Sequence, residues 1–83
     1  MAWTIPGGTI APGVTQEFTF TFSGGADVGP QFIQARPTSN NALLYTNTFG
    51  EATGAAGQLS YRATLRNGGA TVASYIWRGG GVT

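Results

Sequence analysis

An aromatic pair near the end of the sequence suggests the clearest chemistry. Tyr75 and Trp77 alternate within TVASYIWR, and Arg62, Thr64 and Arg66 alternate within the preceding run YRATLRN. An aromatic ring packs on the C–H face of a sugar, and guanidinium and hydroxyl groups donate hydrogen bonds to sugar oxygens. If these five side chains share one sheet face, they form a platform for carbohydrate recognition.

The orientation of the two rings depends on the turn between the runs. Asn-Gly-Gly at 67–69 is a typical hairpin turn, so strands 58–67 and 70–78 are predicted to pair. A two-residue loop pairs odd positions with even ones, which places Tyr75 and Trp77 beside Arg62 and Thr64 on the outer face. A three-residue turn with a bulge would exchange the two faces, because one residue of slip reverses every side chain.

Two other interpretations account for the same aromatic residues. The rings could be buried against Trp3 and Ile5 of the N-terminal segment, or the last strand could be covered on both faces. An exposed aromatic patch is also typical of a subunit interface. In that case Arg62 could stack on Trp77 within the protein.

The composition argues against an enzyme. Histidine, cysteine and lysine are absent, which removes the commonest bases, nucleophiles and zinc ligands. The three acids are Glu17 on an expected strand and Asp27 and Glu51 in expected turns. Nothing in their spacing brings two carboxylates together for glycosidase or aspartic-protease chemistry. We therefore expect no catalytic residue, no metal site and no cofactor.

The charge pattern limits the class of partner. Charged residues make up 8% of the chain, compared with roughly 25% in an average domain, and the net charge is +1. Nucleic-acid binding and polybasic membrane binding both require clustered positive charge, which this chain lacks. No apolar run is long enough to cross a bilayer. The expected partner is a glycan or a second copy of the chain.

The pattern of elements predicts an all-β fold. Fourteen glycines and four prolines interrupt the chain, and no segment sustains a helical period. Alternation in VTQEFTFTF points Phe18, Phe20 and Phe22 toward a core. Further strands are expected at 31–35 and 42–49, with a small-residue loop at 50–57. Together with the final two strands, they predict a small antiparallel β-sandwich or partly open barrel of about five to seven short strands without disulfides.

We expect one domain over residues 1–83, near the lower size limit for a self-sufficient core. Two prolines make 1–13 an edge strand or arm, and 79–83 reads as a glycine-rich tail. No signal peptide is recognisable, so the location is undetermined, although the composition suits an extracellular or particle-surface setting. Association between subunits would help to stabilise so small a core.

Two functions therefore follow from the sequence. The first is a non-enzymatic, lectin-like module that binds carbohydrate through Tyr75, Trp77, Arg62, Arg66 and Thr64. The alternative is a self-assembling shell, fibre or appendage subunit in which the aromatic face is the subunit interface. Single-stranded nucleic-acid binding on an aromatic sheet face ranks last because of the low net charge.

Overall fold

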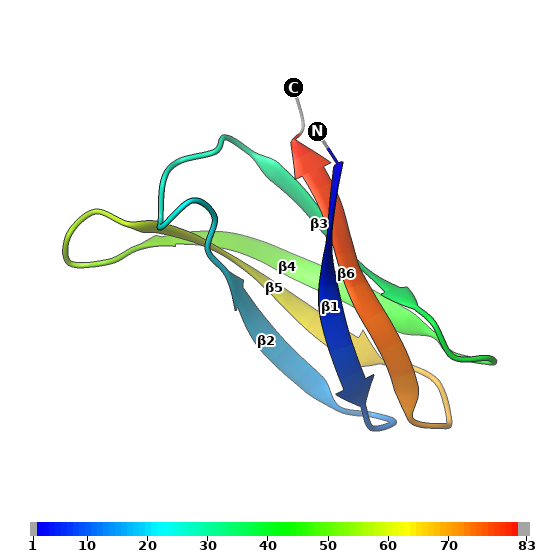
Figure 1. Cartoon of the computed structure of the whole chain (residues 1–83). Helices are drawn as coiled ribbons and strands as arrows, with labels where there is room; N and C mark the ends of the chain where they lie inside the picture. Colours follow the sequence, from blue (N-terminus) through cyan, green and yellow to red (C-terminus); the bar gives the residue numbers. More distant parts are fainter. Residues whose placement is uncertain (1, 82–83) are drawn as a thin grey trace.

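The computed structural model describes residues 2–81, which form six β-strands in two sheets and no helix (Figure 1). The strands are β1 (Ala2–Ile10), β2 (Thr15–Phe20), β3 (Gln31–Pro37), β4 (Leu44–Thr53), β5 (Leu59–Asn67) and β6 (Ala73–Gly81). Two antiparallel sheets form in the orders β1-β6-β3 and β2-β5-β4. The prediction of a small antiparallel β-sandwich is confirmed.

The alternation of apolar and polar residues in β2 and β5 agrees with the prediction. Tyr61, Ala63 and Leu65 of β5 are buried, whereas Arg62 and Arg66 on the opposite face are exposed. In β2, Phe20 is buried and Phe18 is half-buried against the core. One face of this sheet therefore packs inward and the other faces water, as is common in antiparallel sheets.

Aromatic rings from both sheets build the centre of the core. Trp77 of β6 lies edge-on to Phe18 and Phe20 of β2, with ring centroids 5.1 and 4.9 Å apart. Tyr75 contacts Phe18 at 6.2 Å and Trp77 at 5.6 Å, also edge-on. Tilted rings extend the cluster through Trp3 and Phe22. Such edge-to-face geometry is the favoured arrangement of aromatic pairs and adds to the burial of their area.

The predicted outward orientation of Tyr75 and Trp77 is therefore wrong. Their exposed fractions are 6% and 3%, and Ala73 on the same face of β6 is fully buried. The error lies in the pairing of strands, because β5 and β6 belong to different sheets and do not form a hairpin. Residues 68–72 cross from one sheet to the other. Across such a crossing the odd positions of both strands turn toward the shared core, so the hairpin rule does not apply.

Asn67 at the end of β5 holds this crossing in place. Its side-chain Nδ2 donates to the carbonyl oxygens of Ile10 and Thr71, each at 2.9 Å. Its Oδ1 accepts a hydrogen bond from the backbone N–H of Gly69 at 2.9 Å. Asn67 is completely buried, and it joins the end of β1, the end of β5 and the crossing segment.

Strand β1 lies at the edge of the β1-β6-β3 sheet. Its pairing with β6 shifts between Pro6 and Thr9, where Gly7 and Gly8 form a bulge. Proline in a sheet is confined largely to edges and bulges because it lacks the N–H that a ladder needs. At the other end of the chain, β6 continues through Gly81, so 79–81 is strand instead of the expected tail. Residues 82–83 of that predicted tail, and residue 1, lie outside the described residues.

A bulge in β4 changes the direction of its side chains. Pairing with β5 shifts between Asn47 and Phe49, and Thr48 between them has a positive φ of 42°. Asn47 lies opposite Thr64 on the outer face, whereas Phe49 lies opposite Ala63 on the inner face. The strand also extends to Thr53, into the segment predicted to be a loop. A bulge of this kind commonly re-aims side chains at an edge or a site.

Candidate functional site

The five predicted site residues separate into two groups. Arg62, Thr64 and Arg66 lie on the outer face of the β2-β5-β4 sheet, as predicted. Tyr75 and Trp77 lie in the core on β6, in the other sheet. The predicted platform of aromatic and arginine side chains is therefore not assembled in this form.

Several polar side chains on the outer face of the β2-β5-β4 sheet form ion pairs or hydrogen bonds within the sheet. The Arg62 guanidinium pairs with the Glu17 carboxylate at 3.4 Å. The Thr64 hydroxyl donates to the carbonyl oxygen of Asn47 at 2.8 Å and lies 2.6 Å from the Thr48 hydroxyl. These contacts stabilise the sheet surface and leave fewer groups for a ligand.

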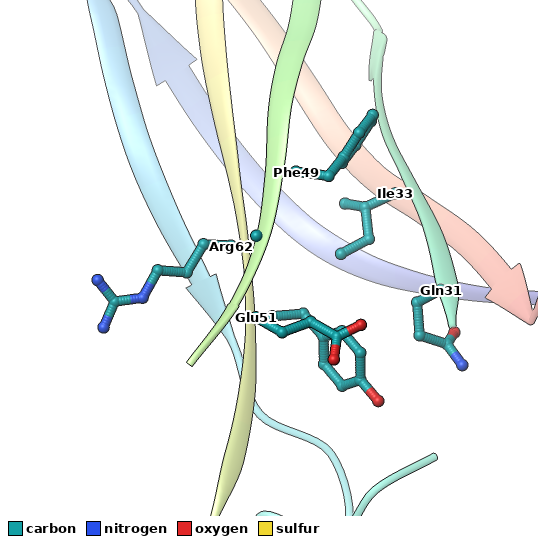
Figure 2. Close-up of a pocket in the computed structure, with 7 residues that line it drawn as sticks. Gln31, Ile33, Phe49, Glu51 and Arg62 are labelled. Carbon is teal, nitrogen blue, oxygen red and sulfur yellow. The ribbon is translucent and has the colours of Figure 1, made fainter. Parts of the chain in front are cut away.

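A cleft opens between β3 and β4 at the edge of the sandwich (Figure 2). Its volume is about 210 Å³. Ile33 of β3 and Tyr61 of β5 are buried core residues that contribute to its lining. The exposed side chains around it are Phe49 and Glu51 of β4, and half-buried Gln31 of β3 lies across from them. Arg62 also borders the cleft, but Figure 2 shows its side chain pointing away from the other labelled residues.

The cleft combines an apolar ring with hydrogen-bonding groups. Phe49 is 58% exposed, although it projects from the inner face of its sheet. The Glu51 carboxylate is an acceptor only, whereas the Gln31 amide offers both a donor and an acceptor. Gln31 is fixed in place, since its Oε1 accepts from Trp3 Nε1 at 3.0 Å and its Nε2 donates to the Val28 carbonyl at 3.1 Å. Among residues 2–81, no partner engages the second lone pair of Oε1 or the second N–H of Nε2.

Tyr61, which lines the cleft, fixes the loop that leads into β3. Its hydroxyl donates to the carbonyl oxygen of Gly29 at 2.8 Å and accepts from the N–H of Val28 at 3.2 Å. Gly29 is further held through the Asp27 carboxylate, which accepts its N–H at 2.9 Å. The segment that leads into β3 is therefore tied to the sheet on the far side of the core.

Sequence reasoning missed both Phe49 and Glu51. By simple alternation they continue the outer face of Tyr45 and Asn47, and Glu51 also falls in the segment assigned to a loop. The bulge at Thr48 brings both side chains to the inner face. The run Tyr-Thr-Asn-Thr-Phe contains no glycine or proline to announce a bulge, so the sequence offers no local signal for it.

A second groove lies at the opposite edge of the sandwich, between β1 and β2. Its volume is about 370 Å³, and Ile5, Pro6 and Gly7 form one side with 18–21 on the other. Tyr75 and Trp77 also line it, so a small part of each predicted ring is reachable from this edge. Burial raises the pKa of the Tyr75 hydroxyl above its ordinary value.

Residues 2–81 contain no helix with the length and hydropathy to cross a membrane. In the same range, no three histidine, cysteine, aspartate or glutamate side chains come together as metal ligands would. No protein-family model, curated protein or solved structure matches this chain.

Proposed function

We propose that this protein is a non-catalytic, lectin-like module that binds carbohydrate in the cleft between β3 and β4. The observation that carries the proposal is an exposed Phe49 ring that shares the cleft with a carboxylate and an amide. A ring stacks on the C–H face of a sugar, and the carboxylate of Glu51 accepts charge-assisted hydrogen bonds from its hydroxyl groups. The aromatic residue of the site is thus Phe49 in place of Tyr75 and Trp77.

The size and rigidity of the cleft suit one ring of a longer saccharide. Its 210 Å³ is below the range of about 300–1,000 Å³ that is usual for pockets that enclose a ligand. Gln31 and Tyr61 are both held by hydrogen bonds before any ligand arrives. A pre-ordered site loses less conformational entropy on binding, which helps a small, open cleft to hold its ligand.

Binding without catalysis agrees with the acids of the cleft. Among the described residues that line it, Glu51 is the one carboxylate. Hydrolysis of a glycosidic bond usually requires two carboxyl groups, one on each side of the bond. Asp27 and Glu17 do not line this cleft.

Replacement of Phe49 tests the proposal. We expect Phe49→Ala to weaken glycan binding at least tenfold, about 1.4 kcal/mol, because the stacking surface is lost. Phe49→Trp should retain binding. Val72→Ala is the matched control, since Val72 is also 58% exposed but lies in the crossing segment outside the cleft. A glycan array followed by calorimetry provides the measurement, and wild-type affinity in Phe49→Ala would refute the site.

Self-assembly is the second candidate, and a different edge of the molecule favours it. The groove between β1 and β2 places the core rings of Tyr75 and Trp77 beside the free edge of β2. An edge strand with unpaired backbone groups is a template for another strand, and an apolar groove beside it would add burial. In this case the chain is a structural subunit, and its mass in solution rises with concentration.

A further inference from the structure

The outer face of the β1-β6-β3 sheet carries a second set of groups suited to recognition. Thr4, Arg78 and Gln34 lie in register across the three strands and form one polar row. In the adjoining row Phe32 lies opposite Gly80, which has no side chain. The Phe32 ring therefore lies beside a position without a side chain, next to a row of hydrogen-bonding groups.

A groove of about 310 Å³ is lined by Thr4, Phe32, Gln34 and Arg78, together with Ala2, Trp3 and Gly79. Phe32 is 56% exposed, and Thr4, Gln34 and Arg78 are also exposed. Within the described residues, the Arg78 guanidinium makes no ion pair. It is a planar donor on a rigid central strand, which suits bidentate contact with a carboxylate or sulfate group.

The charge of this face is one-sided. Arg36 and Arg78 both belong to it, whereas the three acids of the chain lie on β2, on β4 and in the loop before β3. Across the described residues, no acid therefore belongs to β1, β3 or β6. An anionic group that approaches this sheet gains attraction from two arginines, and none of the three strands contributes a carboxylate that would repel it.

The groove and the cleft between β3 and β4 adjoin at β3. The rings of Phe32 and Phe49 are 6.4 Å apart between centroids and are tilted by 36°. Phe32 belongs to the groove and Phe49 to the cleft, so one saccharide chain can contact both rings. Glu51 determines which part of the saccharide occupies the cleft. Its carboxylate repels an anionic group there and accepts hydrogen bonds from neutral hydroxyl groups.

We infer that the groove is a subsite for the acidic group of a uronate-bearing or sulfated saccharide, with Arg78 as its main ligand. Gln34 and Thr4 supply neutral hydrogen bonds, and Phe32 supplies the stacking surface. This inference rests on the proposed carbohydrate function and extends it from the sugar ring in the cleft to the charge of the neighbouring ring.

The test compares acidic oligosaccharides with neutral ones of the same backbone. We expect the wild-type protein to bind uronate-bearing or sulfated forms at least tenfold more tightly, with a preference that falls as salt rises. Arg78→Gln should abolish this preference and leave neutral binding unchanged. Arg66→Gln is the matched control, because it removes the same charge from the opposite sheet. Comparison of uronate with sulfate separates the two sources of negative charge.

The possible outcomes distinguish failure of the acidic subsite from failure of the carbohydrate function. Neutral binding that depends on Phe49, without a preference for acidic forms, overturns the subsite and leaves the carbohydrate function standing. An equal loss of preference in Arg78→Gln and Arg66→Gln shows a general charge effect and also overturns the subsite. Absence of binding to any saccharide overturns both proposals together.

Discussion

Among residues 2–81, the Asn67 side chain makes more hydrogen bonds than any other buried side chain. Both of its N–H groups and its carbonyl oxygen are engaged, and the residue is fully buried. Each hydrogen bond of such a buried amide adds only modestly to the stability of the fold. Removal of the amide, however, leaves each buried partner without a hydrogen bond, which costs more. It therefore stabilises the crossing of the chain between sheets after β5.

We expect Asn67→Ala to lower the free energy of unfolding by roughly 2–4 kcal/mol. Asn67→Asp should be more damaging at neutral pH, because a carboxylate offers no donor to the carbonyls of Ile10 and Thr71. Asn47→Ala is the control, since the Asn47 side chain is exposed and its change should stay within about 0.5 kcal/mol. Urea unfolding measures all three, and equal stability of Asn67→Ala and Asn47→Ala would contradict this role.

Single residues also mark the limit of sequence-based prediction for the site. Arg62, Thr64 and Arg66 lie on the predicted face because simple alternation holds throughout β5. Phe49 does not follow its alternation, because the bulge at Thr48 inserts one residue before it. That bulge is set by pairing with β5, which is contact between distant residues and leaves no mark in the local sequence.

At the scale of strands, the bulge in β1 depends on a glycine that no other residue can replace without movement. A Cβ added to Gly7 would lie 2.6 Å from Cδ2 of Tyr75 and would also collide with the Tyr75 backbone. A Cβ added to Gly8 would meet nothing nearer than the Tyr75 hydroxyl, at 3.8 Å. Neither glycine has a positive φ, so the contrast between them is purely steric.

We expect Gly7→Ala to lower the free energy of unfolding by about 1–3 kcal/mol, the usual cost of overpacking. Gly8→Ala should change it by less than about 0.5 kcal/mol. Thermal or urea unfolding of the two variants measures the difference directly. Equal destabilisation would mean that the bulge fixes the backbone by conformation and not by its contact with Tyr75.

The strands themselves were predictable, but their partners were not. The alternating phenylalanines of β2 and apolar residues of β5 predict both strands and their inner faces. A glycine-rich turn, however, serves equally for a hairpin and for a crossing between sheets. The choice depends on Asn67 and on the aromatic core that receives Tyr75 and Trp77, and these are tertiary contacts.

At the scale of the whole molecule, the four sheet edges are unequally protected. The edges of β3 and β4 are joined by a hydrogen bond from the Ala35 N–H to the Thr46 hydroxyl, at 3.0 Å. Strand β1 carries Pro6 and a bulge, which blunt an edge against pairing. Strand β2 contains neither proline nor glycine, and it borders the groove between β1 and β2. If copies of the chain associate through a strand edge, we expect the contact to form at β2, which is the least protected of the four edges.

The backbone pattern of β2 suggests a clean way to block that edge. Asn67 N–H donates to the Val14 carbonyl, so alternate residues from Val14 onward face β5 and Thr19 directs its N–H away from it. Proline at such a position removes an outward donor without removing a bond of the ladder. Thr19→Val keeps the N–H and the strand propensity, which makes it the matched control.

If the protein assembles through β2, sedimentation velocity should show wild-type mass that rises with concentration. Thr19→Pro should remain monomeric and Thr19→Val should behave as wild type, with circular dichroism confirming that both variants fold. Phe49→Ala should leave the mass unchanged, because Phe49 lies at the opposite edge of the sandwich. A wild-type protein that stays monomeric at every concentration removes the structural-subunit function. Assembly that survives Thr19→Pro instead assigns the interface to another surface, of which the exposed Phe32 and Phe49 are the next to test.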